Sequence, residues 1–435
     1  MTQAALLGGP RAVSLPLPEW PRIDDETIAA VVRVLKSEPL CPVGNTGIQG
    51  EFEDAFAAFH ERRFALATNG GTAALMLSVH GAGVEPGDEV ICSPFSWGAS
   101  VACVLQCAAI PVFADISART LGLDAASVRS RITPRTRAIL PVHIFGAPCD
   151  MDGILEVADE HGIPVIEDVA QAAGGFYRGR RLGSLGAFSA FSLQASKNLT
   201  GGEGGILVCD DREMFERAMS HGTHPQRLVA ELELPEFRRR IDSLAFNFRM
   251  HTASAAIAHT QLRHLDAWTE IRNQNAQRLY AAVRDLEYLE FPPLPDPAEG
   301  SRHGFYHIPF LYRPGVLPLD RDQFVAALEA EGAPAGCYVK IPLYLRPRLR
   351  MHDYVGRDFP WCLGEGSYEY GRGDCPVAEA LCEKEWQLKA SFHEPLPELI
   401  DQIVQALRKV GETADEIAAA AATSGVVSGG RAAGT

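Results

Sequence analysis

Seven short apolar runs constrain the fold more than any other feature of this sequence. The runs are rich in Val, Ile and Ala and lie at residues 64–68, 89–93, 111–114, 138–144, 164–168, 187–193 and 205–208. Most of the intervals between them are long enough for a helix, and several are amphipathic. Strands joined by such crossovers indicate an α/β fold with a mainly parallel sheet covered on both faces. In open sheets of this kind ligands bind beyond the carboxyl ends of the strands, so we expect the chemistry there.

Helical patterns flank the sheet region. Asp24 and Asp25 precede the apolar stripe Ile28, Val31, Val32 and Leu35, which predicts a capped amphipathic helix. A longer helical pattern, from about 264 to 286, leads into a Pro-rich segment typical of a hinge. We therefore predict an N-terminal arm (1–24), a large domain (25–265), a linker helix with a smaller domain (266–422) and a disordered tail (423–435).

Composition excludes several classes of function. The net charge is −15 without a basic stripe, which argues against nucleic acid as the main partner. No apolar run reaches the roughly 18 residues that a membrane span needs, and residues 1–10 lack a secretory signal, so we expect a cytoplasmic protein. The ten cysteines form no CxxC pair, which indicates reduced thiols and no metal site.

Two strand ends carry residues suited to a planar phosphorylated ligand. Asn69-Gly70-Gly71-Thr72 joins the first run to a helical segment. A glycine turn that opens a helix presents free N–H groups and the positive end of the helix dipole to a phosphate, although the same tetrapeptide also suits an ordinary turn. The second run ends near Trp97, which could stack on a planar ring or belong to the core.

Two further strand ends carry charged residues. Glu167 and Asp168 end a buried run, where acids are costly unless paired; one could face a ligand nitrogen, or either could cap a helix. Lys197 lies among small residues and precedes Gly201-Gly202-Glu203-Gly204-Gly205. Desolvation would lower its pKa and make it a competent amine nucleophile. A phosphate cradle, a stacking aromatic ring, a carboxylate and an amine are together what pyridoxal 5′-phosphate (PLP) requires.

The motifs that surround these residues resemble one family. They are Phe191-Ser192 … Lys197-Asn198-Leu199-Thr200 … Gly202-Glu203-Gly204-Gly205, Glu167-Asp168-Val169-Ala170-Gln171-Ala172 and Phe246-Asn247-Phe248-Arg249-Met250. On these residues the sequence resembles the DegT/DnrJ/EryC1/StrS family of PLP-dependent sugar and cyclitol aminotransferases, from about residue 47 to 261 and more weakly to 410. The resemblance implies PLP fold type I, aspartate-aminotransferase-like, with a mainly parallel seven-stranded sheet and a smaller C-terminal α/β domain.

The resemblance also implies the role of each site residue. The two residues implied in catalysis are Lys197, which would bind the cofactor aldehyde, and Asp168, which would pair with the pyridine nitrogen. Cofactor contacts would come from Gln171 at the phenolic oxygen, Trp97 on the ring, and Gly70, Gly71, Thr72 and Ser192 at the phosphate. Asn247 would reach the phosphate of the neighbouring subunit, which implies a homodimer with shared active sites.

The implied activity is transfer of an amino group from glutamine or glutamate to a keto-sugar or keto-cyclitol in secondary metabolism, such as aminoglycoside antibiotic or amino-sugar biosynthesis. A synthase resembling those that make aminohydroxybenzoate, a PLP-dependent sugar dehydratase and a non-catalytic regulatory homologue remain alternatives. Such dehydratases typically replace the lysine by histidine, and a regulatory protein would be free to lose Lys197 or Asp168.

Some segments depart from the family pattern. They are Ala173, His251-Thr252-Ala253 and Cys337-Tyr338-Val339-Lys340, and the last two lie where substrate contacts are expected. The basic stretch Arg346-Pro347-Arg348-Leu349-Arg350 suits either an anionic substrate or plain surface. The N-terminal Pro18-Glu19-Trp20-Pro21 and the segment Phe95-Ser96-Trp97 resemble the cyclitol branch of the family.

Overall fold

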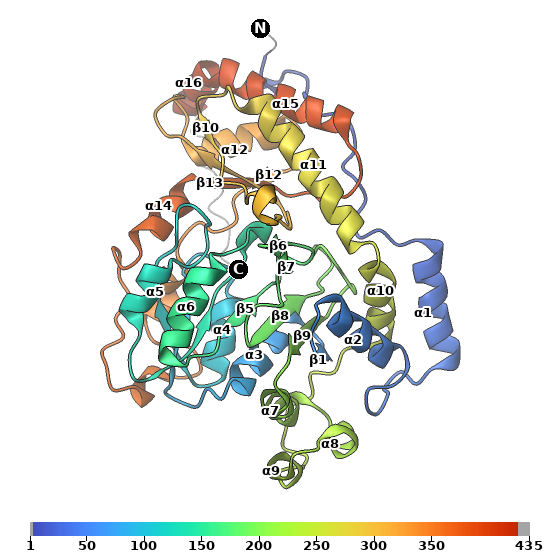
Figure 1. The fold of residues 1–435 in the computed structure, drawn as a ribbon. Coiled ribbons are helices and arrows are strands. Elements are labelled where there is room, and N and C mark those ends of the chain that lie inside the picture. The colour runs from blue at the N-terminus through green and yellow to red at the C-terminus, as the bar shows by residue number, and fades with distance from the viewer. Residues whose placement is uncertain (1–2, 425–435) are drawn as a thin grey trace.

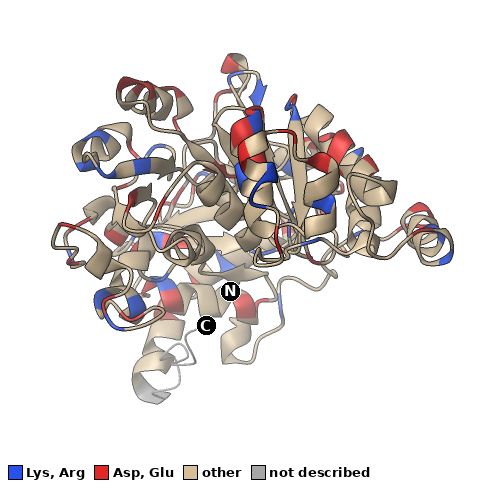
Figure 2. Cartoon of the chain, turned by 90° about the horizontal axis from the view of Figure 1, so that it is seen from below, with Lys and Arg blue, Asp and Glu red and all other residues tan. Residues whose placement is uncertain are grey.

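The computed structural model of the chain describes residues 3–424 (Figure 1). Most of the predicted tail, residues 425–435, lies outside the described residues, whereas Thr423 and Ser424 end helix α16 (Ala414–Ser424). Within the described part no helix is both long and apolar enough to cross a membrane. Basic and acidic segments are interspersed over the elements, and in the view of Figure 2 no basic stripe runs across them.

All seven predicted runs form strands of one central sheet. They are β1 (Phe64–Thr68), β2 (Glu89–Cys92), β3 (Ile110–Phe113), β4 (Thr136–Leu140), β5 (Ile166–Asp168), β8 (Phe188–Ser192) and β9 (Gly205–Cys209). Parallel bridges such as Val142 to Asp168 join the β3-β2-β4 and β5-β8-β9-β1 parts. Of these seven strands β9 alone runs opposite to the other six, and its pairings with β1 and β8 are antiparallel, so the mainly parallel sheet is confirmed.

Helices cover both faces of this sheet. The strands alternate their side chains between two apolar layers; Leu66 of β1 enters one layer, and Ala65 and Ala67 enter the other. The first layer includes α3 (Gly71–Gly81), α4 (Ala99–Gln106) and α7 (Arg212–Gly222). The second includes α2 (Gly47–Phe59), α5 (Ala125–Arg131), α6 (Met151–His161) and α10 (Thr252–Leu262). The short α8 (Pro225–Glu231) and α9 (Pro235–Arg238) follow α7, and β6 (Phe176–Tyr177) pairs with β7 (Arg180–Arg181).

The predicted first helix is present as α1 (Asp25–Ser37), and Asp24 caps it by accepting the Thr27 N–H at 2.9 Å. Most of its apolar stripe, however, lies away from the core of the chain; of the four stripe residues Val31 alone packs, half-buried, against the second layer. Ile28 is 51% exposed and Leu35 60%, whereas the buried residues are Thr27 and Val34. The helix packs on α10 through the other face, so periodicity located the helix but not its buried side.

A second, smaller sheet is wholly antiparallel, in the order β10-β11-β13-β12. Its strands are β10 (Leu289–Glu290), β11 (Ile308–Tyr312), β12 (Ala335–Gly336) and β13 (Glu385–Leu388). Even-numbered residues of β11 and β13, such as Phe310 and Trp386, form a third core. That core includes α11 (Leu265–Val283), α12 (Arg321–Ala330) and α15 (Pro397–Glu412), and α11 is the predicted linker helix.

The chain between β12 and β13 returns to the large sheet. This segment holds α13 (Pro347–Arg350) and α14 (Pro376–Lys384), and its buried side chains from Leu343 to Cys382 join the core beside α4. The Tyr370 hydroxyl donates to the Pro111 carbonyl at 2.6 Å, which fixes the segment to β3. The boundary at 265/266 stays a prediction, and part of residues 266–422 packs with the larger sheet.

Candidate active site

Lys197 lies in a turn just after β8, at the end of the strand that the sequence indicated. Its backbone N–H donates to Gln194 O at 2.9 Å, and its Nζ lies 4.1 Å from the centre of the Tyr306 ring. Burial lowers the pKa of Lys197 to about 8, while the nearby Asp168 carboxylate opposes the shift. A lysine with this pKa has about one-tenth of its amine neutral at pH 7, far more than an ordinary lysine, and the neutral amine is the nucleophile.

Asp168 ends β5 on the side of the sheet that faces Lys197. Its Oδ2 accepts a hydrogen bond from Ser100 Oγ at 2.7 Å, and its Oδ1 accepts the Ala170 N–H at 3.1 Å. Ser96 Oγ lies 2.8 Å from Ser100 Oγ and extends this chain of hydroxyl groups. Burial raises the pKa of Asp168, and the bonds from Ser100 and Ala170 work against that rise.

Glu167 points away from Lys197, and its contacts are with groups of the protein that it holds in place. Its carboxylate accepts hydrogen bonds from five groups, namely the N–H groups of Gly183, Leu185 and Gly186, Ser189 Oγ and His143 Nε2. Burial alone would raise the pKa of Glu167, but the hydrogen bond from His143 and the backbone donors lower it to about 2. The Cys149 N–H donates to His143 Nδ1 at 3.1 Å, so the imidazole proton that faces Glu167 is on Nε2. Glu167 has five donors and Asp168 has two, so Asp168 is the acid with acceptor capacity left for a ligand.

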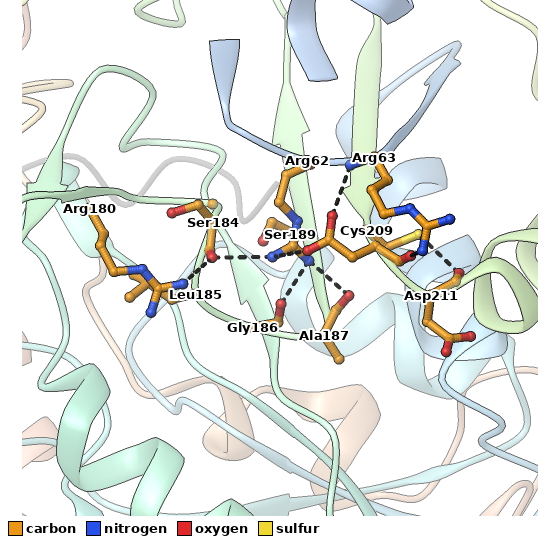
Figure 3. A network of polar contacts seen from close by, with 12 residues as sticks. Arg62, Arg63, Arg180, Ser184, Leu185, Gly186, Ala187, Ser189, Cys209 and Asp211 are labelled. Atoms are coloured by element: carbon orange, nitrogen blue, oxygen red, sulfur yellow. Dashed lines mark hydrogen bonds and ion pairs between the residues drawn. The ribbon is translucent and has the colours of Figure 1, made fainter. Parts of the chain in front are cut away.

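Arg62 also binds this loop, through its backbone carbonyls (Figure 3). Its guanidinium donates to the carbonyls of Ser184, Gly186 and Ala187 at 3.2, 2.8 and 3.1 Å, and it pairs with Asp210 at 3.2 Å. The loop that enters β8 is thus clamped between Arg62 and Glu167. This clamp fixes the strand that carries Ser192 and leads to Lys197.

The predicted phosphate turn has the close packing that a cradle requires. Gly70 precedes α3, and the first N–H groups of that helix have no partner within the helix. A Cβ on Gly71 would lie 2.8 Å from Ser192 Cβ, and one on Gly205 would lie 2.5 Å from Gly70 C. Only glycine permits this approach, which leaves N–H groups and the helix dipole for an anion. The turn, Asp168 and the Lys197 amine fit PLP on the evidence of their own geometry.

Gln171 connects the site to the smaller sheet. Its Oε1 accepts the Phe145 N–H at 2.7 Å, and its Nε2 donates to the Tyr338 hydroxyl at 2.7 Å. The Tyr306 hydroxyl lies 2.8 Å from Ser196 Oγ, beside the lysine. No sequence motif pointed to Tyr306 or Ser100 as site residues, because a Tyr before a strand and a Ser in a helix have no characteristic pattern. Ser96 lies in the loop before α4 and Ser100 in the helix, so no helical spacing in the sequence pointed to the hydroxyl pair.

Two predicted cofactor residues lie at the surface of the single chain. Trp97 is 57% exposed in the loop just before α4. Asn247 is exposed, and its Oδ1 accepts the Arg249 N–H at 3.4 Å. Stacking by Trp97 and a contact from Asn247 to a neighbouring subunit stay predictions.

The topology of the large sheet and the residues at its strand ends define a class, the PLP enzymes of fold type I. The model of the DegT/DnrJ/EryC1/StrS aminotransferase family matches residues 21–408, and the chain belongs to that family. It is a PLP-dependent aminotransferase, and its relatives are sugar and cyclitol aminotransferases.

Three similar proteins illustrate the range of the family. The L-glutamine:2-deoxy-scyllo-inosose aminotransferase of Streptomyces lividus is 39% identical over 397 residues, covering 86% of this chain and 89% of that protein. The GDP-perosamine synthase of Caulobacter vibrioides is 36% identical over 322 residues, covering 72% and 81%. The crystal structure of an aminotransferase from Psychrobacter cryohalolentis has a TM-score of 0.79 and 30% identity, covering 92% of this chain and all of that one.

Proposed function

We propose that this enzyme transfers an amino group from glutamine or glutamate to a keto-cyclitol or keto-sugar of secondary metabolism, as in aminoglycoside or amino-sugar biosynthesis. One observation carries the chemistry: a lysine with a pKa of about 8 lies close to a buried aspartate. The S. lividus relative, which uses L-glutamine and an inosose, supports the donor and favours a free cyclitol as the acceptor. The cytoplasmic location predicted from the sequence belongs to this proposal.

The proposed roles of the chain's residues follow from their surroundings. When bound, PLP supplies a ring that withdraws electrons from the reacting carbon of the substrate. The Asp168 carboxylate would hold a proton on the ring nitrogen, and Gly70, Gly71, Thr72 and Ser192 would hold the phosphate. Lys197 Nζ would bind the aldehyde and, once released, move a proton to and from the substrate carbon as general acid and base. Gln171 would lie at the phenolic oxygen, and Trp97 would stack on the ring.

We propose a homodimer with shared active sites. Exposed apolar side chains support it: Trp97 and Phe246 are each 57% exposed and Leu244 is 88% exposed, and Ile28 and Leu35 of α1 are exposed as well. A monomer rarely leaves so many large apolar groups in water. A partner subunit over Phe246 would bring its own Asn247 close to this site, as the family pattern implies.

The experiment that tests the proposed activity separates its two halves by absorbance. Protein saturated with PLP should lose its visible band when glutamine or glutamate is added, because the amino group passes to the cofactor. The resulting amino form is then mixed with 2-deoxy-scyllo-inosose or with a GDP-linked keto-sugar. If the visible band returns with the cyclitol, the result supports the proposal. If the band returns with the GDP-linked sugar alone, the acceptor belongs to the nucleotide sugars and is not a free cyclitol. No loss of the band with either amino donor contradicts the proposed amino donors.

A further inference from the structure

The N-terminal arm is tied first to the smaller domain. The Glu331 carboxylate accepts the N–H groups of Ala5 and Ala12 at 2.7 and 3.0 Å, and it pairs with Lys409 Nζ at 2.8 Å. The Val13 N–H donates to the Glu331 carbonyl at 3.0 Å. One buried glutamate therefore holds the first half of the arm.

The second half of the arm reaches the main chain of Lys197. The Trp20 indole Nε1–H donates to the Lys197 carbonyl at 3.1 Å. Two residues later, Gln261 Nε2 of α10 donates to the Arg22 carbonyl at 3.2 Å. Trp20 is thus fixed on both sides along the chain, and its polar edge contacts the turn that carries the lysine.

A buried cluster holds the Trp20 ring in place. The ring packs edge-on against Trp268, with centroids 5.2 Å apart and planes at 83°, and lies 4.8 Å from the His393 ring. The guanidinium of Arg272 lies 5.1 Å from the Trp20 ring. Arg272 is fully buried, and burial lowers its pKa to about 9; within residues 3–424 it has no acidic partner, only a bond to Ser391 Oγ at 3.2 Å. The indole face therefore contributes directly to stabilising a buried cation, which makes the ring costly to move.

We infer that Trp20 is a positioning residue for Lys197, whose indole N–H holds the turn so that the amine stays between Asp168 and the Tyr306 ring. The inference rests on the proposed role of Lys197. Other bonds hold the residues around the lysine: the Lys197 N–H donates to Gln194 O, and the next side chain, Asn198 Nδ2, donates to Gly304 O at 2.8 Å. The bond from Trp20 is the one that acts on the carbonyl of Lys197 itself, and glycines follow at 201 and 202. A small rotation of the backbone at Lys197 moves the distant Nζ atom farther than it moves the Cα atom. Because the hydrogen bond from Trp20 fixes the Lys197 carbonyl, it limits the positions that Nζ can reach. Trp20 belongs to the segment Pro18-Glu19-Trp20-Pro21, which resembles the cyclitol branch of the family, and the inference gives this segment a role in positioning Lys197.

The test replaces Trp20 in the full chain by two residues that lack the donor. Trp20→Phe keeps an aromatic ring, and 3-benzothienylalanine at position 20 keeps the shape of the indole and replaces its N–H by sulfur. Trp268→Phe is the matched control, since Trp268 contacts the Trp20 ring but no bond joins it to Lys197. The readouts are the dissociation constant of PLP, the pH midpoint for labelling the Lys197 amine in cofactor-free protein, and the melting temperature.

Both Trp20 replacements should weaken PLP binding about three- to tenfold, the range for one lost hydrogen bond. The labelling midpoint should rise from about 8 towards the ordinary lysine value, because a looser turn lets the amine reach water. Trp268→Phe should lower the melting temperature and leave the other two readouts within twofold of wild type. Unchanged binding and labelling in both Trp20 variants, or equal shifts in Trp268→Phe, would overturn the inference. Retention of the visible band by Lys197→Ala would instead overturn the proposed role of Lys197.

Discussion

Burial moves the pKa values of Lys197 and Asp168 in opposite directions. It favours the neutral form of each, and the attraction between the charged forms opposes both shifts. The amine is therefore available as a nucleophile, while the carboxylate depends on its donors to stay ionised. The surroundings of each side chain therefore suit it to a different role: Lys197 as the nucleophile and Asp168 as the partner of a ring nitrogen.

Lys197 should show this in the cofactor-free enzyme. Its amine should be labelled by an amine-reactive reagent with a pH midpoint near 8, well below the ordinary lysine value of about 10.4, because burial disfavours the charged form. Peptide mass spectrometry across pH 6 to 11 measures the midpoint. Lys197→Ala should lose both the labelled peptide and the visible band with PLP while keeping its circular dichroism spectrum. A midpoint near 10.4 would mean that the amine is solvated.

Ser100 is predicted to keep Asp168 ionised. Ser100→Ala removes the 2.7 Å bond to Oδ2, and a lost bond to a charged group costs about 1.5–3 kcal/mol. The rate of the donor half-reaction should fall about tenfold or more, and Ser100→Thr should restore most of it. Ser78→Ala is the control, since Ser78 is a buried helical serine whose hydroxyl donates to the Ala74 carbonyl of its own helix. Equal rates in Ser100→Ala and Ser78→Ala would show that the bond does not matter.

Among the elements, the sequence predicted the seven strands and the linker helix because periodicity and turn residues are local signals. It also predicted the glycine turn and Lys197 at their strand ends. It could not predict that β9 runs antiparallel or that residues 343–382 return to the large sheet, since both depend on long-range packing. For the same reason Tyr306 and Tyr338, which approach from the smaller domain, were not recognised as neighbours of Lys197 and Gln171. The exposed stripe of α1 shows that periodicity does not distinguish a core from a surface that a partner could cover.

The turn before α3 should be sensitive to a single methyl group. In Gly71→Ala the new Cβ would lie 2.8 Å from Ser192 Cβ, so the cradle must open. Affinity for PLP should fall at least tenfold, whereas affinity for pyridoxal, which lacks the phosphate, should change much less. Gly98→Ala is the matched control, because it precedes α4 with no atom within 4 Å of the new Cβ. Fluorescence titration measures both ligands, and equal losses for both would argue against a phosphate cradle.

At the scale of the whole molecule, shared active sites can be tested by complementation. Lys197→Ala and Asn247→Ala should each be nearly inactive as homodimers. After the two variants are unfolded together and refolded, half of the dimers are mixed and each holds one intact site, so about a quarter of wild-type activity should return. Light scattering should give a mass near twice 47.1 kDa. A monomer in solution, or no recovery of activity on mixing, would show that each chain builds its site alone.

The central claim is that an amino group passes from a donor to a polyhydroxy ketone through this site. The most direct measurement follows the nitrogen itself, with glutamine labelled by ¹⁵N either on the α-amino group or on the side-chain amide and 2-deoxy-scyllo-inosose as acceptor. Mass spectrometry should find the product amine heavier by one unit with the α-labelled donor alone. An amine that carries the amide nitrogen, or no aminated product from either a cyclitol or a sugar ketone, would contradict the account.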